Sequence, residues 1–153
     1  MTVTFFGHRN APQEIANSLT YTLIALIEKE NATKFYVGNQ GSFDSMVLTV
    51  LKTLKRRYPH ITYDVVLAYL PACAPSYTST DHINTIFPEG LERVPQKYAI
   101  SKRNRWLIEH SDLVITYVTH PFGGAAACRE LAIKKGKRVI DLADNGCRGS
   151  AHS

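Results

Sequence analysis

The chain has 153 residues, 44% of them hydrophobic and 20% charged, with a formal net charge of +5 and an isoelectric point near 9.2. This composition is typical of a single folded globular domain and excludes a disordered chain. The longest basic run is only Lys55-Arg56-Arg57, so we expect an anionic small molecule as partner and regard nucleic acid as unlikely.

Short apolar runs alternate with amphipathic stretches from the first residues onward. Runs rich in β-branched and aromatic residues predict strands at 3–6, 34–37, 61–70, 113–118 and 138–142. The first predicted helix has Asn10 as its cap and Pro12 in its first turn, and it closes at Asn31.

The second predicted helix has the clearest pattern, with apolar residues at i, i+3, i+4, i+7, i+8 and i+11. These residues are Phe43, Met46, Val47, Val50, Leu51 and Leu54. Two further helices are predicted at 98–110 and 124–135. The stretch 71–95 has four prolines and little periodicity, so we interpret it as a lid or ligand loop, with a segment that is disordered without ligand as the alternative.

This alternation predicts an α/β fold, a Rossmann-like doubly wound parallel sheet of about five strands with helices on both faces. We expect one domain over residues 1–143 and a frayed tail over 144–153. Ligands bind such sheets beyond the carboxyl ends of the strands. The unusual turns follow predicted strands, at Gly7-His8-Arg9, Gly38-Asn39-Gln40-Gly41 and Pro121 to Gly124, and they should therefore converge on one edge.

Three cysteines, Cys73, Cys128 and Cys147, show no paired close spacing, so neither a disulfide framework nor a metal site is expected, and no cofactor is implied. Cys128 is predicted to be a small buried hydrophobe. No apolar stretch could span a bilayer and no apolar leader precedes the first strand, which leads us to expect a cytoplasmic protein without membrane contact.

The Gly123-Gly124 pair stands where a predicted strand turns into a helix. A ligand can approach glycine backbone closely, and the unpaired N–H groups of the helix start favour phosphate. Glu130 should share a helix face with Ala126, whose small side chain leaves room for a ligand beside that carboxylate. A tight strand–helix joint with a surface Glu is the alternative.

Charged residues at the other turns are further candidates. Arg103 lies on the helix stripe that should face the protein, whereas Arg105 falls off it, and a cation on an apolar stripe needs a carboxylate or a ligand. His8 and Arg9 follow the first strand and could hold a phosphate or a base, although His8 could equally bond a backbone group. Asp44 opens the second helix, where it could also serve only to compensate the helix dipole.

Four segments together resemble the SLOG group of Rossmann-like nucleotide-binding proteins, and small bacterial and phage members in particular. They are Phe5 to Arg9, Val37 to Asp44, Lys102 to Trp106, and Asp112 to Ile115 leading to Phe122-Gly123-Gly124. Within the group, the Lonely guy phosphoribohydrolases carry the signature Pro-Gly-Gly-x-Gly-Thr-x-x-Glu, which Phe122 to Glu130 fits without a gap. Ala126 and Ala127 replace its Gly and Thr, and the lost Thr removes a hydroxyl that could bind phosphate.

The resemblance implies an enzyme that hydrolyses the N-glycosidic bond of a nucleoside monophosphate, and a homodimer or larger homo-oligomer. Glu130 would stabilise the positive charge that develops on the ribose, and Arg103 would orient Glu130 or hold a ribose or phosphate oxygen. The alternative is a non-catalytic module that binds a nucleotide-derived signal; DNA binding, as in the SLOG domain of a DNA-processing protein, ranks below both. The residues expected to hold the ligand are Gly7, His8, Arg9, Gly38, Asn39, Gly41, Asp44, Gly123, Gly124 and Ala125.

Overall fold

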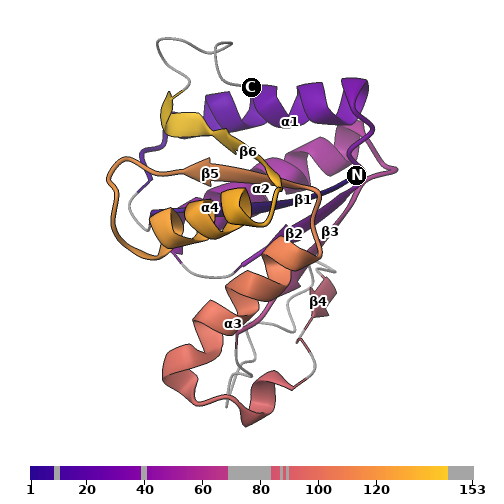
Figure 1. The fold of residues 1–153 in the computed structure, drawn as a ribbon. Coiled ribbons are helices and arrows are strands. Elements are labelled where there is room, and N and C mark those ends of the chain that lie inside the picture. The colour runs from indigo at the N-terminus through magenta and orange to yellow at the C-terminus, as the bar shows by residue number, and fades with distance from the viewer. Residues whose placement is uncertain (9–10, 39–40, 69–83, 87, 89, 145–153) are drawn as a thin grey trace.

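A parallel six-stranded sheet with helices on both faces forms the core of the computed structural model, which describes residues 1–8, 11–38, 41–68, 84–86, 88 and 90–144 (Figure 1). The strand order is β4-β3-β2-β1-β5-β6. The strands are β1 (Thr2–Gly7), β2 (Lys34–Val37), β3 (Thr62–Val66), β4 (Asn84–Ile86), β5 (Leu113–Tyr117) and β6 (Arg138–Asp141). The helices are α1 (Ile15–Lys29), α2 (Gly41–Arg57), α3 (Gln96–Glu109) and α4 (Gly124–Lys134), with 3₁₀ turns η2 (Leu91–Arg93) and η3 (Leu142–Asp144).

The two faces of the sheet carry separate apolar clusters, because successive side chains of a strand point to opposite sides. Val3 and Phe5 of β1 belong to the cluster built with α1 and α2, whereas Phe6 belongs to the cluster built with α3 and α4. Both clusters contain fully buried residues, such as Phe35 on one face and Ile108 on the other. Helices on both faces bury all of β5, which accounts for its mostly apolar run around the buried Thr116.

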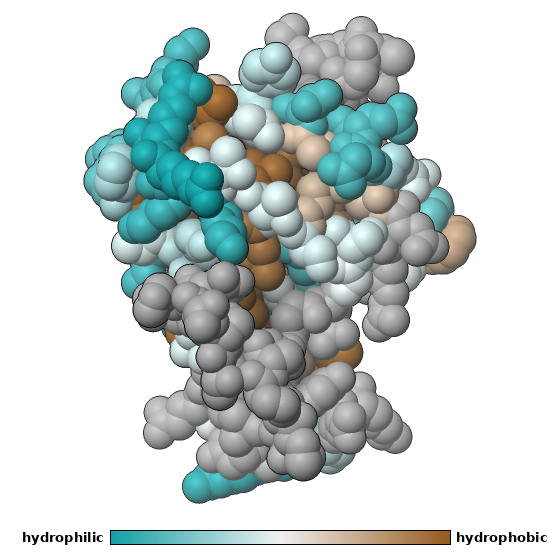
Figure 2. Space-filling model, turned by 180° about the vertical axis from the view of Figure 1, so that it is seen from behind, coloured by the Kyte–Doolittle hydropathy of each residue, from teal (hydrophilic) through white to brown (hydrophobic). Residues whose placement is uncertain are grey.

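The molecule's rear face shows apolar residues in a band down its middle, flanked in the upper part by hydrophilic residues (Figure 2). Hydrophilic residues also gather at the upper end of this face. Within the described parts of the chain, no helix has both the length and the apolar character needed to cross a membrane.

The doubly wound α/β prediction is confirmed, with two corrections to its details. The sheet has six strands, because β4 adds a three-residue edge strand inside the stretch that we interpreted as a loop. Helix α1 begins at Ile15 rather than at the expected Asn10 cap, and its N-cap Glu14 makes no side-chain capping bond. The rest of the expected 71–95 loop lies largely outside the described residues, as does the tail from residue 145.

The strand order shows where in the sheet the expected site should lie. From β1 the chain winds outward through β2, β3 and β4, and it then returns to the other side of β1 as β5 and continues to β6. The reversal between β1 and β5 is the position where doubly wound sheets bind ligands, at the carboxyl ends of the strands. The loop from β5 to α4 begins there, and it forms the left edge of the molecule in Figure 1.

Candidate functional site

A pocket of about 570 Å³ opens at the carboxyl ends of β1 and β5, beside the start of α4. It brings together most of the described residues that we predicted from the sequence as site residues. Those that line it are Gly7, His8, Gly38, Asp44, Arg103, Gly123, Gly124 and Ala125. Arg9 and Asn39 lie outside the described residues. Gly41, which starts α2 with a φ of 87°, is not among the residues that line the pocket.

The start of α4 is open toward the pocket. Gly123 has a φ of 96°, a left-handed conformation that favours glycine, and it precedes α4 without a side-chain capping bond. The first backbone bond across this turn is Ala127 N–H to the Gly123 carbonyl oxygen. A Cβ added at Gly124 would meet no atom within 4 Å. Gly123, Gly124 and Ala125 line the pocket, so the start of α4, whose first N–H groups have no partner within the helix, borders its open space, which suits an anionic oxygen.

Arg103 and Asp44 converge behind this space, at Gly38. Arg103 is 3% exposed and Asp44 is 8% exposed. A Cβ added at Gly38 would lie 2.9 Å from Asp44 Oδ2 and 3.0 Å from Arg103 Nη1. A side chain at position 38 would require Asp44 or Arg103 to shift, and the burial of Asp44 shows that it does more than compensate the dipole of α2.

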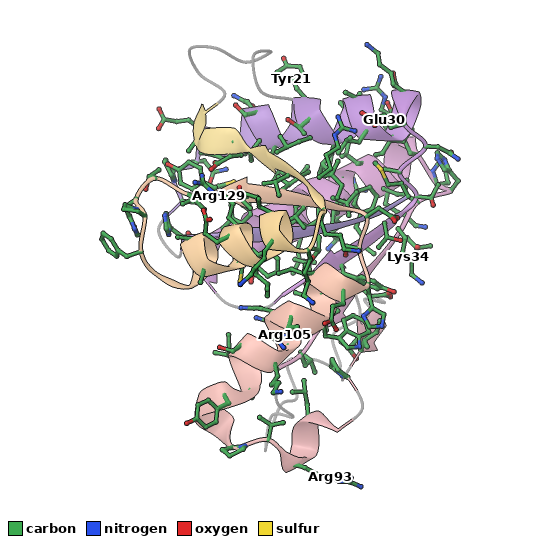
Figure 3. The ribbon with its side chains drawn as sticks, in the orientation of Figure 1. Tyr21, Glu30, Lys34, Arg93, Arg105 and Arg129 are labelled. Carbon is green, nitrogen blue, oxygen red and sulfur yellow. The ribbon has the colours of Figure 1, made fainter. Side chains whose placement is uncertain are left out.

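The orientation of α3 agrees with the predicted stripe. Arg103 is buried and its Nη1 donates to the Val66 carbonyl oxygen at 2.9 Å, which ties α3 to the end of β3. Its Nε donates to Asn104 Oδ1 at 2.9 Å. Arg105 is exposed on the same helix (Figure 3). The expectation that Arg103 faces the protein and Arg105 does not is confirmed.

Gly7 lines the pocket with its backbone, but its lack of a side chain serves packing. A Cβ at position 7 would lie 2.3 Å from Cγ of Phe43, which is fully buried at the start of α2. The close approach that requires glycine here is therefore that of an aromatic ring and not of a ligand.

His8 follows β1 and bonds backbone, which was one of the two roles we had left open for it. Its Nε2 accepts a hydrogen bond from Thr119 N–H at 3.0 Å, so the ring is neutral and carries its proton on Nδ1. Burial lowers the pKa of His8, and the neighbouring His120 lowers it further, while Asp141 acts in the opposite direction.

His120 lines the pocket and stacks on Phe122, which lies beside the pocket lining, and we did not single out this ring contact from the sequence. The rings of His8 and His120 stack with centroids 3.7 Å apart and an interplanar angle of 16°. The rings of His120 and Phe122 stack at 4.1 Å and 24°. The parallel register that pairs Gly7 with Tyr117 brings the residues after β1 beside the residues after β5. Aromatic residues after both strands were the available signal.

Glu130 does not lie beside the pocket, where the sequence led us to expect it. Its side chain is 70% exposed and lies 3.8 Å from Arg129 Nη2, and it does not line the pocket. Ala126 stands at one edge of the buried stripe of α4, so its i+4 neighbour falls on the solvent side. Arg129, in turn, pairs with the buried carboxylate of Asp141 at 2.5 Å (Figure 3).

Cys128 is buried on the core side of α4, as predicted, and burial raises the pKa of its thiol to about 11. Cys73 and Cys147 lie outside the described residues. Among the residues that the structure describes, no group of three His, Cys, Asp or Glu could hold a metal ion.

No protein-family model matches this chain, and no curated protein matches it. Solved structures of DNA processing protein A from two organisms are similar to it in fold. DNA processing protein A from Streptococcus pneumoniae is 16% identical, with a TM-score of 0.65 over 92% of this chain and 49% of that chain. DNA processing protein A from Helicobacter pylori is 19% identical, with a TM-score of 0.62 over 92% of this chain and 64% of that chain. The chain therefore spans about half to just under two thirds of their lengths.

These neighbours confirm the coarse part of what the resemblance implies, the Rossmann-like α/β fold. They contradict its finer part. Both are DNA-processing proteins, and the Helicobacter pylori protein binds single-stranded DNA. Our expectation of a nucleotide ligand, hydrolysed or sensed, is therefore wrong, and so is our dismissal of nucleic acid as a partner. The dismissal depended on a missing basic run, but backbone N–H groups at a helix start hold phosphates without one.

Proposed function

We propose that this chain is a SLOG-group protein that binds single-stranded nucleic acid at the carboxyl edge of its sheet. The observation that carries the proposal is the uncapped start of α4, where Gly123 and Gly124 open the first N–H groups of the helix to a pocket of about 570 Å³. Such a helix start binds phosphate oxygens through N–H groups and the positive end of the dipole.

The choice of a polymer over a free nucleotide follows the DNA-processing neighbours, since a helix start alone would suit either ligand. The formal net charge of +5 supports it, because a positive protein attracts a polyanion over a long range. Backbone N–H groups contact phosphates and carry no base information, so we expect binding that depends weakly on sequence.

The pocket residues take distinct roles in this proposal. The backbone at Gly123, Gly124 and Ala125 holds a phosphate. Arg103 and Asp44, packed against Gly38, form the wall behind it and keep α3 in register with β3. Glu130 has no role here, because it lies outside the pocket.

Fluorescence anisotropy with a labelled oligothymidylate of about 12 nucleotides, within the usual range of single-strand site sizes, tests this function. Gly124→Val places a branched side chain in the open space before α4, and it should weaken binding at least ~10-fold while the melting temperature stays near that of the wild type. Ala127→Val is the matched control, because Ala127 is exposed on the same helix but does not line the pocket. Equal affinities for the two variants would refute the placement of the phosphate.

A further inference from the structure

A continuous row of aromatic rings runs from the core to the surface at this site. Phe43, fully buried, stacks on Tyr117 with centroids 6.3 Å apart and an interplanar angle of 19°. Tyr117 meets His8 edge-on at 6.3 Å, and His8 stacks on His120, which stacks on Phe122. The outermost ring, Phe122, is 68% exposed.

Hydrogen bonds to the backbone hold the outer rings of this row. Thr119 N–H donates to His8 Nε2 at 3.0 Å, which ties the end of β1 to the loop after β5. His120 Nδ1 lies 3.0 Å from the Phe122 carbonyl oxygen, which can only accept, so the imidazole donates. The positions of the His8 and His120 rings are thus set by the protein before any ligand arrives, which reduces the entropy lost on binding.

Phe122 ends the row with most of its surface in water, and Gly124 follows two residues later at the open start of α4. An exposed flat ring, backed by His120 at the pocket wall, thus lies two residues before the proposed phosphate-binding turn. A single nucleotide has the two matching features, a flat base and an adjacent phosphate.

We infer that Phe122, supported by His120 and His8, is a stacking platform for an unpaired base of the bound strand. This inference rests on the proposed function and deepens it, because it says why the partner is single-stranded. In a duplex, neighbouring base pairs cover both faces of each base, whereas an unpaired base offers a free face to the ring. Stacking accepts any base, since each has a π-face.

The test compares two labelled oligonucleotides of equal length, an oligothymidylate and its fully abasic counterpart, which keeps the phosphates but lacks the bases. The wild type should bind the oligothymidylate more tightly. Phe122→Ala should weaken that binding about 5- to 150-fold, the range found when stacked aromatics are truncated, and should leave binding of the abasic strand unchanged. Phe122→Trp should restore the preference for bases.

Tyr21→Ala is the matched control, because Tyr21 is 75% exposed on α1, a helix that packs on the opposite face of the sheet from α4. It should change neither affinity. Equal binding of both strands by the wild type, or equal losses for both strands in Phe122→Ala, would overturn the platform while leaving the proposed function intact. Failure of the wild type to bind either strand would overturn both.

Discussion

The contact between Gly7 and Phe43 makes a sharp prediction about stability. In Gly7→Ala, the new Cβ would lie 2.3, 2.5 and 2.9 Å from three carbons of the Phe43 side chain, closer than Cβ contacts occur in real structures. The ring has little room to retreat, because it is fully buried and stacks on Tyr117. Overpacking of this kind costs about 1–3 kcal/mol. Alanine gives the unfolded chain less conformational freedom than glycine does, which offsets roughly 0.5–1 kcal/mol of that cost.

Thermal and urea unfolding measure the effect. A net loss of about 1–2 kcal/mol should lower the melting temperature of a chain of this size by roughly 2–8 °C. Gly124→Ala is the control, because a Cβ at Gly124 meets no atom within 4 Å. In a Phe43→Ala background, which removes the two nearest of these three carbons, most of the Gly7→Ala penalty should disappear. Equal melting temperatures for Gly7→Ala and Gly124→Ala would refute the packing role of Gly7.

Two further predictions concern charged groups at the site. Arg103→Ala should lower the free energy of unfolding by about 2 kcal/mol or more, because it leaves the buried Val66 carbonyl without its charged donor. Arg105→Ala should change the free energy of unfolding by less than about 0.5 kcal/mol. Urea titrations of both variants measure this difference, and equal losses would mean that α3 is oriented differently. The lowered pKa of His8 means that the unfolded chain takes up a proton below about pH 6.5 before the folded chain does, so the free energy of unfolding should fall as the pH drops from 7.5 to 5.5. The fall should be smaller in His8→Gln, and an identical fall would contradict the lowered pKa.

The fold could be predicted because long periodic segments dominate it. The apolar spacing from Phe43 to Leu54 predicts a helix, and the mostly apolar run of β5 predicts a strand buried on both sides. β4 could not be predicted, since three residues at a sheet edge carry no periodicity. The start of α1 was misjudged because Asn10 and Pro12 are common at helix starts but also occur in turns.

The site could be predicted in its location and less well in its chemistry. Turns after neighbouring parallel strands must meet, so the glycine-rich turns marked the pocket, and the helical stripe placed Arg103 correctly. Spacing along a helix gives the neighbours of a residue but not the side that is buried, which is why Glu130 was misplaced. The stack of His8, His120 and Phe122 depends on the register between β1 and β5, which a single sequence does not specify.

The most direct test of the central claim is an anisotropy titration of the wild-type chain with one labelled single strand, the same strand in a duplex, and unlabelled mononucleotide as competitor. Our account predicts that the single strand binds at least ~10-fold more tightly than the duplex. The logarithm of its association constant should also fall linearly with the logarithm of the salt concentration, and millimolar mononucleotide should compete weakly. Absence of single-strand binding at low salt, or displacement of the strand by mononucleotide at concentrations near the dissociation constant of the strand, would contradict it.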